Sequence, residues 1–583
     1  MNCDLRLTIR VNAVGMSNRT QEPTAKSSFW HDLLDRRITR RTAIGTAAAT
    51  AAAATLPVSF AQAQQGGVTT ANNGAPIGVD PRDNARYYPP FRPIEASRAD
   101  DMTLPPGFRY QILAPWGEEF TEDGRTIGFN HDFVGYFPAD MLEGGHSSTD
   151  AYLTINHEYV NAMFLGTEER TPANMEKEKR AMGVSVVRVR QQGGKWSVVK
   201  DPKNRAVDGL YDIELTGPVR GTDHVKGATM VKGTVGNCSG GQTPWGTLLT
   251  CEENVDGYTK AWDGSGYEAM HQGWVTEIDP FDPEWTPKKR TGMGRFRHEN
   301  AAVVPTADGR VAVYMGDDMQ DSCVYKFISR GTVGTDRSAN RDLLEDGDLY
   351  VANFGNGSWV LLDYDKNAKL REAKNGDKLL FAGQADVLAD ARAAALAVGG
   401  TPVDRPEDIE VHPLNGDVYI ALTNNSKHGN YFGHIVKLTE KGHDHSAETF
   451  GWDVFAYGGP SAGFASPDNL VFDPYGNLWM VTDNSDLGSN PIKDFHGNNA
   501  MFFFPTEGPN AGKAYRFAVG PVDAEMTGPV WSPDGKTLFV SIQHPGEDSE
   551  SLDQLTSNFA AAPGSRVPRP TLVAISGFPG WKA

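Results

Sequence analysis

A short motif that recurs six times along this chain constrains its fold more than any other feature. Each copy has a polar cluster, a short apolar stretch that often ends in Pro, a turn, and an apolar strand that ends in polar residues. The clearest copies begin at Arg405, Ser466 and Glu525. They lie about 60 residues apart, close to the spacing of propeller blades with long loops. The more diverged copies begin at Asn130, Asn237 and Arg297.

The motif predicts an all-β fold. One unit cannot bury both faces of its small sheet alone, whereas radial stacking buries them and leaves only short, protected edges. The 63 Gly and 36 Pro among 583 residues indicate many turns rather than long helices. A β-sandwich or a β-helix is the alternative, but neither places one mostly acidic cluster at the same point of every unit. We therefore expect a six-bladed β-propeller with long loops and a small helical insertion.

The first residues of the chain have the three parts of a twin-arginine export signal. Arg40 and Arg41 form the arginine pair, a weakly apolar run follows over residues 45–56, and Ala61-Gln62-Ala63 is a small-x-small cleavage site. The structural alternative is an Ala-rich helix. The expected divisions of the chain are a twin-arginine signal peptide at 1–63, an extended N-terminal arm at 64–103, and a propeller catalytic domain at 104–583 with the helical insertion at about 384–400.

The charge and hydropathy of the chain argue against a membrane or a nucleic acid as its binding partner. Beyond the signal, no stretch approaches the roughly 18 to 20 apolar residues that span a bilayer, so we expect no stable membrane insertion. The formal net charge is −19, and acidic proteins bind nucleic acid poorly because that binding depends on Lys and Arg neutralising phosphates. The expected partners are the twin-arginine export machinery and a small-molecule substrate. We expect a monomer in the periplasm or outside the cell.

The repeats concentrate carboxylates at equivalent positions. In a propeller, the loops that enter the innermost strands converge at one mouth of the central channel, so these positions become neighbours in space. Strand alternation lets only one of Glu252 and Glu253 face the axis. The candidate metal ligands, from the polar clusters and from the strand ends, are Cys238, Glu299, Glu407, Asp468, Glu525, Glu158, Glu253 and Asp318.

So many carboxylates cannot all ionise in one funnel unless cations are bound there. Carboxylates suit Ca²⁺, whereas a thiolate among them indicates a transition metal as well. Any single acidic turn residue more often caps a strand or makes an Asx-turn, but the set as a whole indicates a metal site.

Cysteines and histidines refine this prediction. Beyond the signal there are three cysteines, which cannot all pair within one chain. Cys238 lies in a Gly-rich polar loop and is the expected ligand, while Cys251 is expected to be a packed thiol. His157, His298 and His544 are either donors that orient carboxylates or satisfied polar groups.

At these same segments the chain resembles the PhoX alkaline phosphatase family. The matching stretches are residues 237–247, 250–254, 297–299, 405–408 and 525–547. The resemblance implies a six-bladed propeller whose mouth holds two ferric ions (Fe³⁺) and calcium ions (Ca²⁺) joined through a bridging oxo group. It implies that Cys238 is an iron ligand, that Glu253, Glu299 and Glu407 are carboxylate ligands, and that Arg405 binds phosphate.

The predicted function is therefore that of a secreted, metal-dependent alkaline phosphatase that hydrolyses phosphomonoesters, with Arg405 and Glu407 as catalytic residues. The planar fork of an arginine matches phosphate oxygens. A calcium-dependent propeller hydrolase of the lactonase or phosphodiesterase type is an alternative, but it needs no thiolate. A non-catalytic, calcium-stabilised scaffold leaves Arg405 unexplained. A quinone-dependent propeller dehydrogenase would show a Trp repeat that this chain lacks. The chain departs from the family pattern at residues 209–212, where an Asn-Thr-Pro-like stretch is usual.

Overall fold

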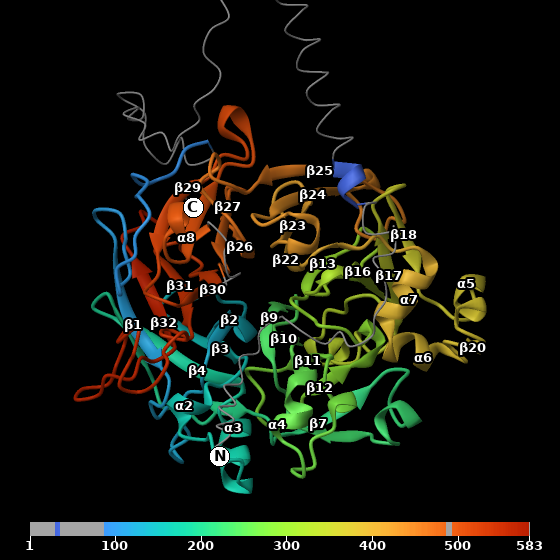
Figure 1. The fold of residues 1–583 in the computed structure, drawn as a ribbon, viewed down its shortest axis with the longest axis horizontal. Helices are drawn as coiled ribbons and strands as arrows, with labels where there is room; N and C mark the ends of the chain where they lie inside the picture. The colour runs from blue at the N-terminus through green and yellow to red at the C-terminus, as the bar shows by residue number, and fades with distance from the viewer. Residues whose placement is uncertain (1–29, 35–86, 485–491, 582–583) are drawn as a thin grey trace, which may run out of the picture.

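The computed structural model describes residues 30–34, 87–484 and 492–581. It confirms the predicted class, because mainly antiparallel sheets form a six-bladed β-propeller (Figure 1). The innermost strands β2, β9, β13, β22, β26 and β30 pack against one another in that order, and β30 packs against β2 to close the ring. The twin-arginine pair, the predicted cleavage site and the first part of the predicted arm lie outside the described residues.

The first three blades have five or six strands each, in order from the innermost strand outward. Blade 1 contains β2 (His131–Pro138), β3 (Asp150–His157), β4 (Gly183–Gln192) and β5 (Lys195–Val198), with β6 (Arg205–Val207) beside β4. Blade 2 contains β9 (Asn237–Gln242), β10 (Leu248–Glu252), β11 (Val275–Ile278), β12 (Lys288–Arg290), β7 (Asp212–Thr216) and β8 (Met230–Lys232). Blade 3 contains β13 (Ala302–Pro305), β14 (Val311–Gly316), β16 (Val324–Ser329), β17 (Gly347–Asn353) and β18 (Ser358–Leu361).

The remaining blades have four strands each. Blade 4 contains β22 (Pro406–Val411), β23 (Val418–Leu422), β24 (His434–Glu440) and β25 (Phe450–Tyr457). Blade 5 contains β26 (Pro467–Phe472), β27 (Leu478–Thr482), β28 (Ala500–Phe504) and β29 (Tyr515–Val519). Blade 6 contains β30 (Glu525–Trp531), β31 (Thr537–Gln543), β32 (Thr571–Ser576) and β1 (Arg109–Pro115). The innermost strand of every blade thus begins at or just after one of the six sequence motifs.

Ring closure is a feature that the repeats did not reveal. Strand β1 comes first in the chain but pairs antiparallel with β32 as the outermost strand of blade 6. The blade is therefore completed from both ends of the propeller sequence. The apolar core lies mainly between blades: separate clusters of buried side chains join blades 3 and 4, 4 and 5, 5 and 6, and 6 and 1, and the largest cluster joins blades 1, 2 and 3. Burial of the blade faces against one another is the main stabilising contribution.

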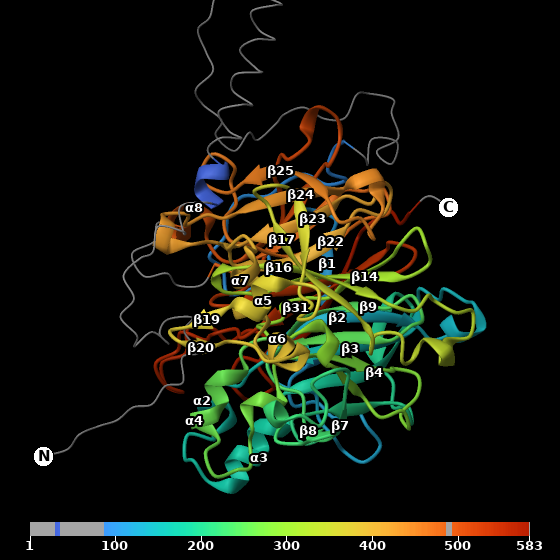
Figure 2. The same ribbon diagram turned by 90° about the vertical axis from the view of Figure 1, so that its right-hand side faces the viewer.

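Most of the helices lie at the rim of the ring in Figure 1, and Figure 2 shows the molecule from the side. The predicted insertion contains α6 (Gln384–Ala389) and α7 (Ala391–Val398), which ends at Gly399 in a left-handed conformation. The other named elements are α2 (Ala162–Leu165), α3 (Pro172–Arg180), α4 (Tyr258–Ala261), α5 (Ala368–Glu372), α8 (Ile492–His496) and the short pairs β15 (Gln320–Ser322) with β21 (Val403–Asp404) and β19 (Lys374–Asn375) with β20 (Lys378–Leu379). Within the described ranges, no helix combines the length and apolar character that crossing a bilayer requires.

Residues 87–103 run along blade 5. Phe91 packs edge-on against Phe517, and Thr103 forms a bridge with Val519. Ile94 donates its backbone N–H to the carbonyl of Arg516 at 3.1 Å. This part of the predicted arm is therefore fixed on the propeller by main-chain hydrogen bonds as well as by apolar contacts.

Candidate active site

The inner strands bring the polar clusters of the repeat to one end of the ring. Neighbouring strands in a blade are antiparallel, so the start of each inner strand lies beside the end of the next strand. In blade 1 His131 pairs with His157, in blade 2 Asn237 pairs with Glu252, and in blade 6 Glu525 pairs with Gln543. The two sets of predicted acids, from strand starts and strand ends, therefore meet at the same mouth.

A β-bulge re-aims the side chains at this mouth. The register shifts between His131 and Val134 in blade 1, between Pro406 and Ile409 in blade 4, and between Pro467 and Leu470 in blade 5. The bulged pairs are Asp132-Phe133, Glu407-Asp408 and Asp468-Asn469. A bulge kinks its strand and redirects a side chain, which is why each acidic residue departs from simple alternation.

The residue after a ligand candidate joins its blade to the next one. Asn300 donates from Nδ2 to the Ile409 carbonyl at 2.7 Å. The Asp408 carboxylate accepts the Leu470 N–H at 2.8 Å, and Asn469 Oδ1 accepts the Gly528 N–H at 2.8 Å. These buried hydrogen bonds connect blades 3, 4, 5 and 6 in turn and hold the preceding acidic residues in fixed positions.

Four blades share a strained turn two residues before the acid. Asn130, Arg405, Ser466 and Asp523 have φ values of 39°, 52°, 49° and 51°. Non-glycine residues rarely adopt this left-handed conformation, and each such residue costs about 1 to 3 kcal/mol unless its surroundings enforce it. Such strain concentrates at functional sites, so its repetition at the mouth marks this end of the ring as the site.

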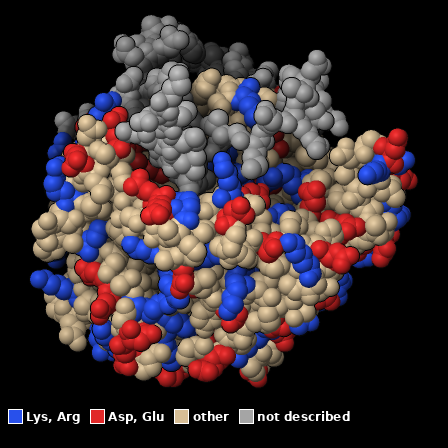
Figure 3. Space-filling view, turned by 60° about the horizontal axis from the view of Figure 1, so that its bottom comes forward, with Lys and Arg blue, Asp and Glu red and all other residues tan. Residues whose placement is uncertain are grey.

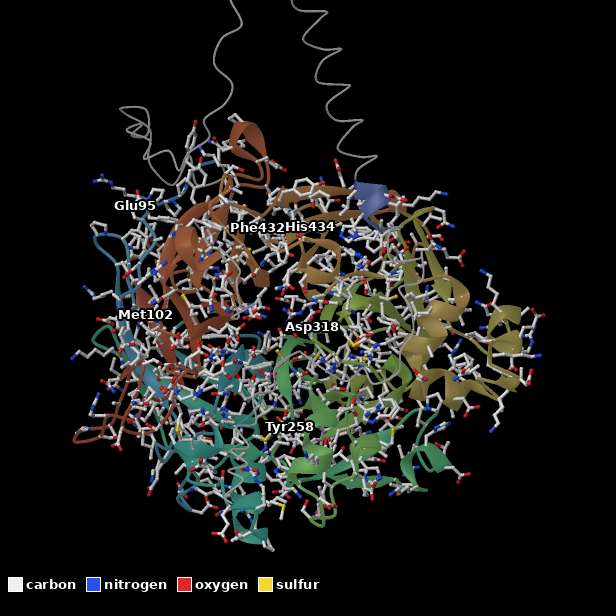
Figure 4. All side chains as sticks on the ribbon, viewed as in Figure 1. Glu95, Met102, Tyr258, Asp318, Phe432 and His434 are labelled. Atoms are coloured by element: carbon white, nitrogen blue, oxygen red, sulfur yellow. The ribbon has the colours of Figure 1, made fainter. Side chains whose placement is uncertain are left out.

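Three overlapping groups of donors form the centre of the mouth. They are Asp132, Glu158 and Cys238; Cys238, Glu253 and Glu299; and Glu299, Asp318 and Glu407, and within each group the ligand atoms lie within 4.8 Å of one another. Cys238 Sγ lies 3.4 Å from Asp132 Oδ2 and 3.3 Å from Glu299 Oε1. Figure 4 labels Asp318 near the middle of the ring. The structure therefore brings six of the eight predicted ligands together.

The two remaining candidates lie outside these groups. Among the described residues, Asp468 and Glu525 do not complete a set of three close donors. Both acids are mostly buried. Burial is the largest cause of the raised pKa of each, followed by the charge of Glu407 for Asp468 and of Asp483 for Glu525, so both belong to the same electrostatic environment.

Glu252 and Glu253 have different roles, as strand alternation requires. Glu253 joins the donor groups, whereas Glu252 points away and forms a fully buried ion pair with Lys289 at 2.7 Å. Glu252 also accepts the backbone N–H groups of Gly273 and Trp274. It therefore connects strands within blade 2 rather than facing the mouth.

Cysteines and histidines near the mouth also separate into two kinds. Cys251 and Cys323 are fully buried in the apolar core, so Cys238 is the one cysteine in the described part of the chain that joins the acids. His157 and His298 contact a Ser hydroxyl or backbone carbonyls, whereas His544 Nε2 lies 3.2 Å from Glu525 Oε2. Burial lowers the pKa of His544, but the Glu547 carboxylate and other nearby acceptors outweigh that effect and raise it.

Arg405 is the cation at the centre of the mouth. Its guanidinium donates to both oxygens of Asp318 at 2.8 Å and lies 2.7 Å from Glu407 Oε1. Burial alone would lower its pKa, but the charges of Asp318 and Glu407 raise it well above the ordinary arginine value. Its side chain is 14% exposed, so it remains partly accessible from the mouth. A bidentate fork held in this way can meet a planar pair of phosphate oxygens.

The acids of the mouth are strongly destabilised as anions when no cation is present. Burial, followed by the charge of Glu407, raises the pKa of Glu299, and burial, followed by Asp318, raises that of Glu253. Burial raises the pKa of Glu158 to about 7. Burial and the neighbouring Asp132 carboxylate raise the pKa of the Cys238 thiol. Bound cations would reverse these shifts because they favour the ionised donors.

Asp132 is the ligand candidate that sequence reasoning missed. It lies in the most diverged copy of the motif, Asn130-His131-Asp132, at the position that the other copies fill with Glu, Asp or, in one copy, Cys238. Alignment of that copy on the acid would have identified it. Two amides were missed as well: Asn254 Nδ2 lies 2.7 Å from Glu253 Oε2, and Gln543 Nε2 bridges Asp132 and Glu158 at 2.5 and 3.2 Å.

The departure from the family pattern at residues 209–212 lies away from the mouth. This stretch leads into β7, which is separated from the innermost strand β9 by β12, β11 and β10. Gly209 donates its backbone N–H to the Lys179 carbonyl at 2.9 Å. The changed residues therefore belong to the outer part of blade 2.

Fold and site together define a propeller hydrolase whose mouth combines carboxylates, the Cys238 thiol and the Arg405 guanidinium. Residues 89–546 match the family described as alkaline phosphatase PhoX, and the chain belongs to this family. The Pseudomonas fluorescens PhoX structure in complex with vanadate, a transition state analogue, is 33% identical, covers 83% of this chain and 97% of its own, and has a TM-score of 0.73. The phosphatase prediction is thus confirmed against the lactonase and scaffold alternatives, and the chain is a phosphomonoesterase of a metal-dependent family.

Other solved structures are much more distant. A Xanthomonas campestris gluconolactonase is 10% identical, with 79% of this chain and 96% of the other covered and a TM-score of 0.26. A Penicillium chrysogenum α-L-arabinanase is 11% identical, with 77% and 94% covered and a TM-score of 0.34. These scores are too low to bear on the site. No curated protein sequence gave a significant match.

Proposed function

We propose that the three donor groups hold ferric iron and calcium, with Cys238 and Glu299 each shared between two groups. The donor set fits such a centre because it combines one thiol with hard carboxylates, the combination expected for a transition metal beside calcium. Asp132 Oδ1 and Glu299 Oε2 are buried without a protein hydrogen-bond partner, which leaves each free for a cation. The proposed ligands are Asp132, Glu158, Cys238, Glu253, Glu299, Asp318 and Glu407, with Asp468 and Glu525 next to them.

The chain's own residues would position this centre and the substrate. Asn254 donates to Glu253 and, at 3.3 Å, to Glu158, and Gln543 donates to Asp132 and Glu158. These amides fix which oxygen of each carboxylate faces the mouth. When bound, the cations supply Lewis acidity toward the phosphoryl group.

Arg405 is proposed to bind the phosphoryl oxygens. It would exchange part of its contact with Asp318 for the substrate, while Glu407 keeps the guanidinium in place. Thr423 Oγ1 donates to Glu407 Oε1 at 3.0 Å and so fixes this carboxylate. Charge that develops on the phosphoryl group would meet a guanidinium that is already oriented, which is the most efficient kind of electrostatic stabilisation.

The substrate is proposed to be a small phosphomonoester released from larger molecules outside the cytoplasm. The net negative charge of the protein disfavours a polyanion. A small anion can instead enter the mouth, where the proposed bound cations and Arg405 would meet it. On the face drawn in Figure 3, acidic and basic side chains are interspersed, which supports this expectation. Residues 1–63 are proposed to direct export through the twin-arginine machinery to the periplasm or the medium, and the enzyme is proposed to act as a monomer.

The single observation that carries the proposal is the convergence of Cys238, six carboxylates and Arg405 at one buried mouth. The test is hydrolysis of 4-nitrophenyl phosphate, with bis(4-nitrophenyl) phosphate and a lactone as comparison substrates, together with elemental analysis. We expect turnover of the monoester, iron and calcium in the protein, and competitive inhibition by vanadate. Calcium without iron, or vanadate that does not compete with substrate, would contradict the assignment.

A further inference from the structure

A short segment of the predicted export signal lies on the folded propeller. Residues 30–34 form a helical turn beside β25, shown in blue in Figures 1 and 2. Trp30 is 2% exposed and Leu34 is 6% exposed, although both precede the propeller by more than seventy residues in the sequence. They belong to the same buried cluster as side chains of blades 3 and 4.

Aromatic rings form the surface that receives this segment. The Trp30 ring stacks on Trp452 at 5.0 Å between centroids, contacts Phe354 edge-on at 5.2 Å and stacks on His434 at 6.0 Å. Aromatic pairs in these geometries add to the free energy gained from burial alone. We call Phe354, His434, Trp452 and Asp404 the docking surface.

A histidine and a buried carboxylate form the polar part of the contact. His31 Nε2 lies 3.2 Å from Asp404 Oδ2, and the His31 ring lies 4.8 Å from that of His428. Asp404 is 1% exposed and also accepts Asn430 Nδ2 at 3.0 Å. Asp404 ends β21 and immediately precedes Arg405, so the docking surface adjoins the element that positions the central arginine.

The pattern of residues 30–34 matches this surface. Trp30 and Leu34 are four residues apart and share one helix face. Both are buried on the propeller, while Asp32 on the other face is exposed. The apolar residues Trp30 and Leu34 therefore face the apolar cluster of blades 3 and 4, and the adjacent His31 faces the buried Asp404 carboxylate. The exposed face carries the charge of Asp32.

We propose that the docking surface is a binding site for the chain's own residues 30–34, which holds the export signal on the folded propeller. Because the surface is assembled from residues of β24, β25 and β21 and from Phe354, which directly follows β17, it exists only after blades 3 and 4 have folded. Docking would thus distinguish a folded precursor from an unfolded one. The docking contact itself is independent of the proposed metal assignment; its meaning for export rests on the proposed signal.

The test is limited proteolysis of the full chain with chymotrypsin, followed at the Leu33–Leu34 bond by mass spectrometry. A synthetic peptide of residues 26–38 serves as the unprotected reference. We expect cleavage in the chain to be about tenfold or more slower than in the peptide, which corresponds to about 1.4 kcal/mol of docking free energy. Trp30→Ala should abolish this protection, and Asp32→Ala, on the exposed face, should preserve it.

Two results would overturn the proposal: cleavage of the wild-type chain as fast as the peptide, or unchanged protection in Trp30→Ala. Hydrolysis of 4-nitrophenyl phosphate by the same samples is measured in parallel. Activity that persists while protection is absent would refute docking and leave the phosphatase assignment intact. Loss of activity with protection retained would support docking and count against the phosphatase assignment.

Discussion

Two adjacent aspartates offer a matched test of the proposed role of Arg405. Asp317 and Asp318 follow β14, and each accepts a fork of hydrogen bonds from a different arginine. Arg392, on helix α7, contacts Asp317, which is fully buried. Arg405 contacts Asp318 inside the donor groups. The two substitutions Arg405→Ala and Arg392→Ala therefore remove similar ion pairs, only one of which lies at the proposed substrate site.

The expected magnitudes follow from these environments. Removing one partner of a buried ion pair costs about 3 to 5 kcal/mol of unfolding free energy, and Arg392, which is 30% exposed, should fall at the lower end. Arg405→Ala should in addition lower kcat/KM by about 10²- to 10³-fold, the usual effect of removing one oriented donor to the transition state. Arg392→Ala should change kcat/KM only a few-fold.

The assay is kcat/KM for 4-nitrophenyl phosphate, with urea unfolding of the same preparations. Because Arg405→Ala leaves Asp318 without its arginine, Arg405→Lys is included; it keeps the charge and loses the fork, so its activity should also fall while its fold is retained. Equal losses of kcat/KM in Arg392→Ala and Arg405→Ala would refute the reasoning, since they would show that the arginine at the mouth acts only through stability.

Four further predictions address the donors, the blade contacts and the response to pH. Cys238→Ser should remove iron, measured by elemental analysis with circular dichroism as the control for folding, because the thiolate is the donor that favours a transition metal; retained iron would contradict the thiolate assignment. In chelated protein, the pKa of Glu158 is about 7 in the folded state and 4.5 in the unfolded state, so the folded state binds more protons between these two pH values. The free energy of unfolding should therefore fall as pH rises from 4.5 to about 7, and it should recover when cations are added. Urea unfolding at the two pH values measures the sign. Asn300→Ala leaves the buried Ile409 carbonyl without its partner and should cost about 1 to 3 kcal/mol, whereas a neutral result in urea would show that blades 3 and 4 do not depend on it. Burial lowers the His496 pKa from 6.5 to about 3, so the unfolded chain binds a proton that the folded chain does not, and stability should decline as pH drops below 6.5; His496→Gln should flatten that decline.

The repeats in the sequence were sufficient to predict the architecture. Alternation of apolar runs with Gly, Asp and Asn turns depends on local preferences, and six copies with one acidic cluster each leave radial packing as the solution that buries all faces. The structure places β14, β23, β27 and β31 on the predicted apolar strands. Cys238, Glu299 and Glu407 could be selected because equivalent positions of a repeat must meet at one mouth.

Other parts of the site depend on register, which the sequence does not display. Whether Glu252 or Glu253 faces the mouth is decided by the register with β9 and by the ion pair of Glu252 with Lys289 on β12, which is distant in the sequence. Asp132 was missed because its copy of the motif is the most diverged, so that its equivalence to Glu407 and Asp468 becomes plain only from the shared bulge and from its contact with Cys238. Local sequence preferences carry no information on such long-range pairings.

By itself, then, the sequence determined the six-bladed fold, the end of the ring that carries the chemistry and most of its donors, since these follow from a repeated local pattern. Only the tertiary structure decided that β1 closes blade 6 and that Trp30 packs on blade 4. It also decided that Arg392 pairs with Asp317 and Arg405 with Asp318. Each of these contacts joins residues far apart in the chain. Their partners are chosen by burial and charge compensation in the assembled ring, which no local pattern encodes.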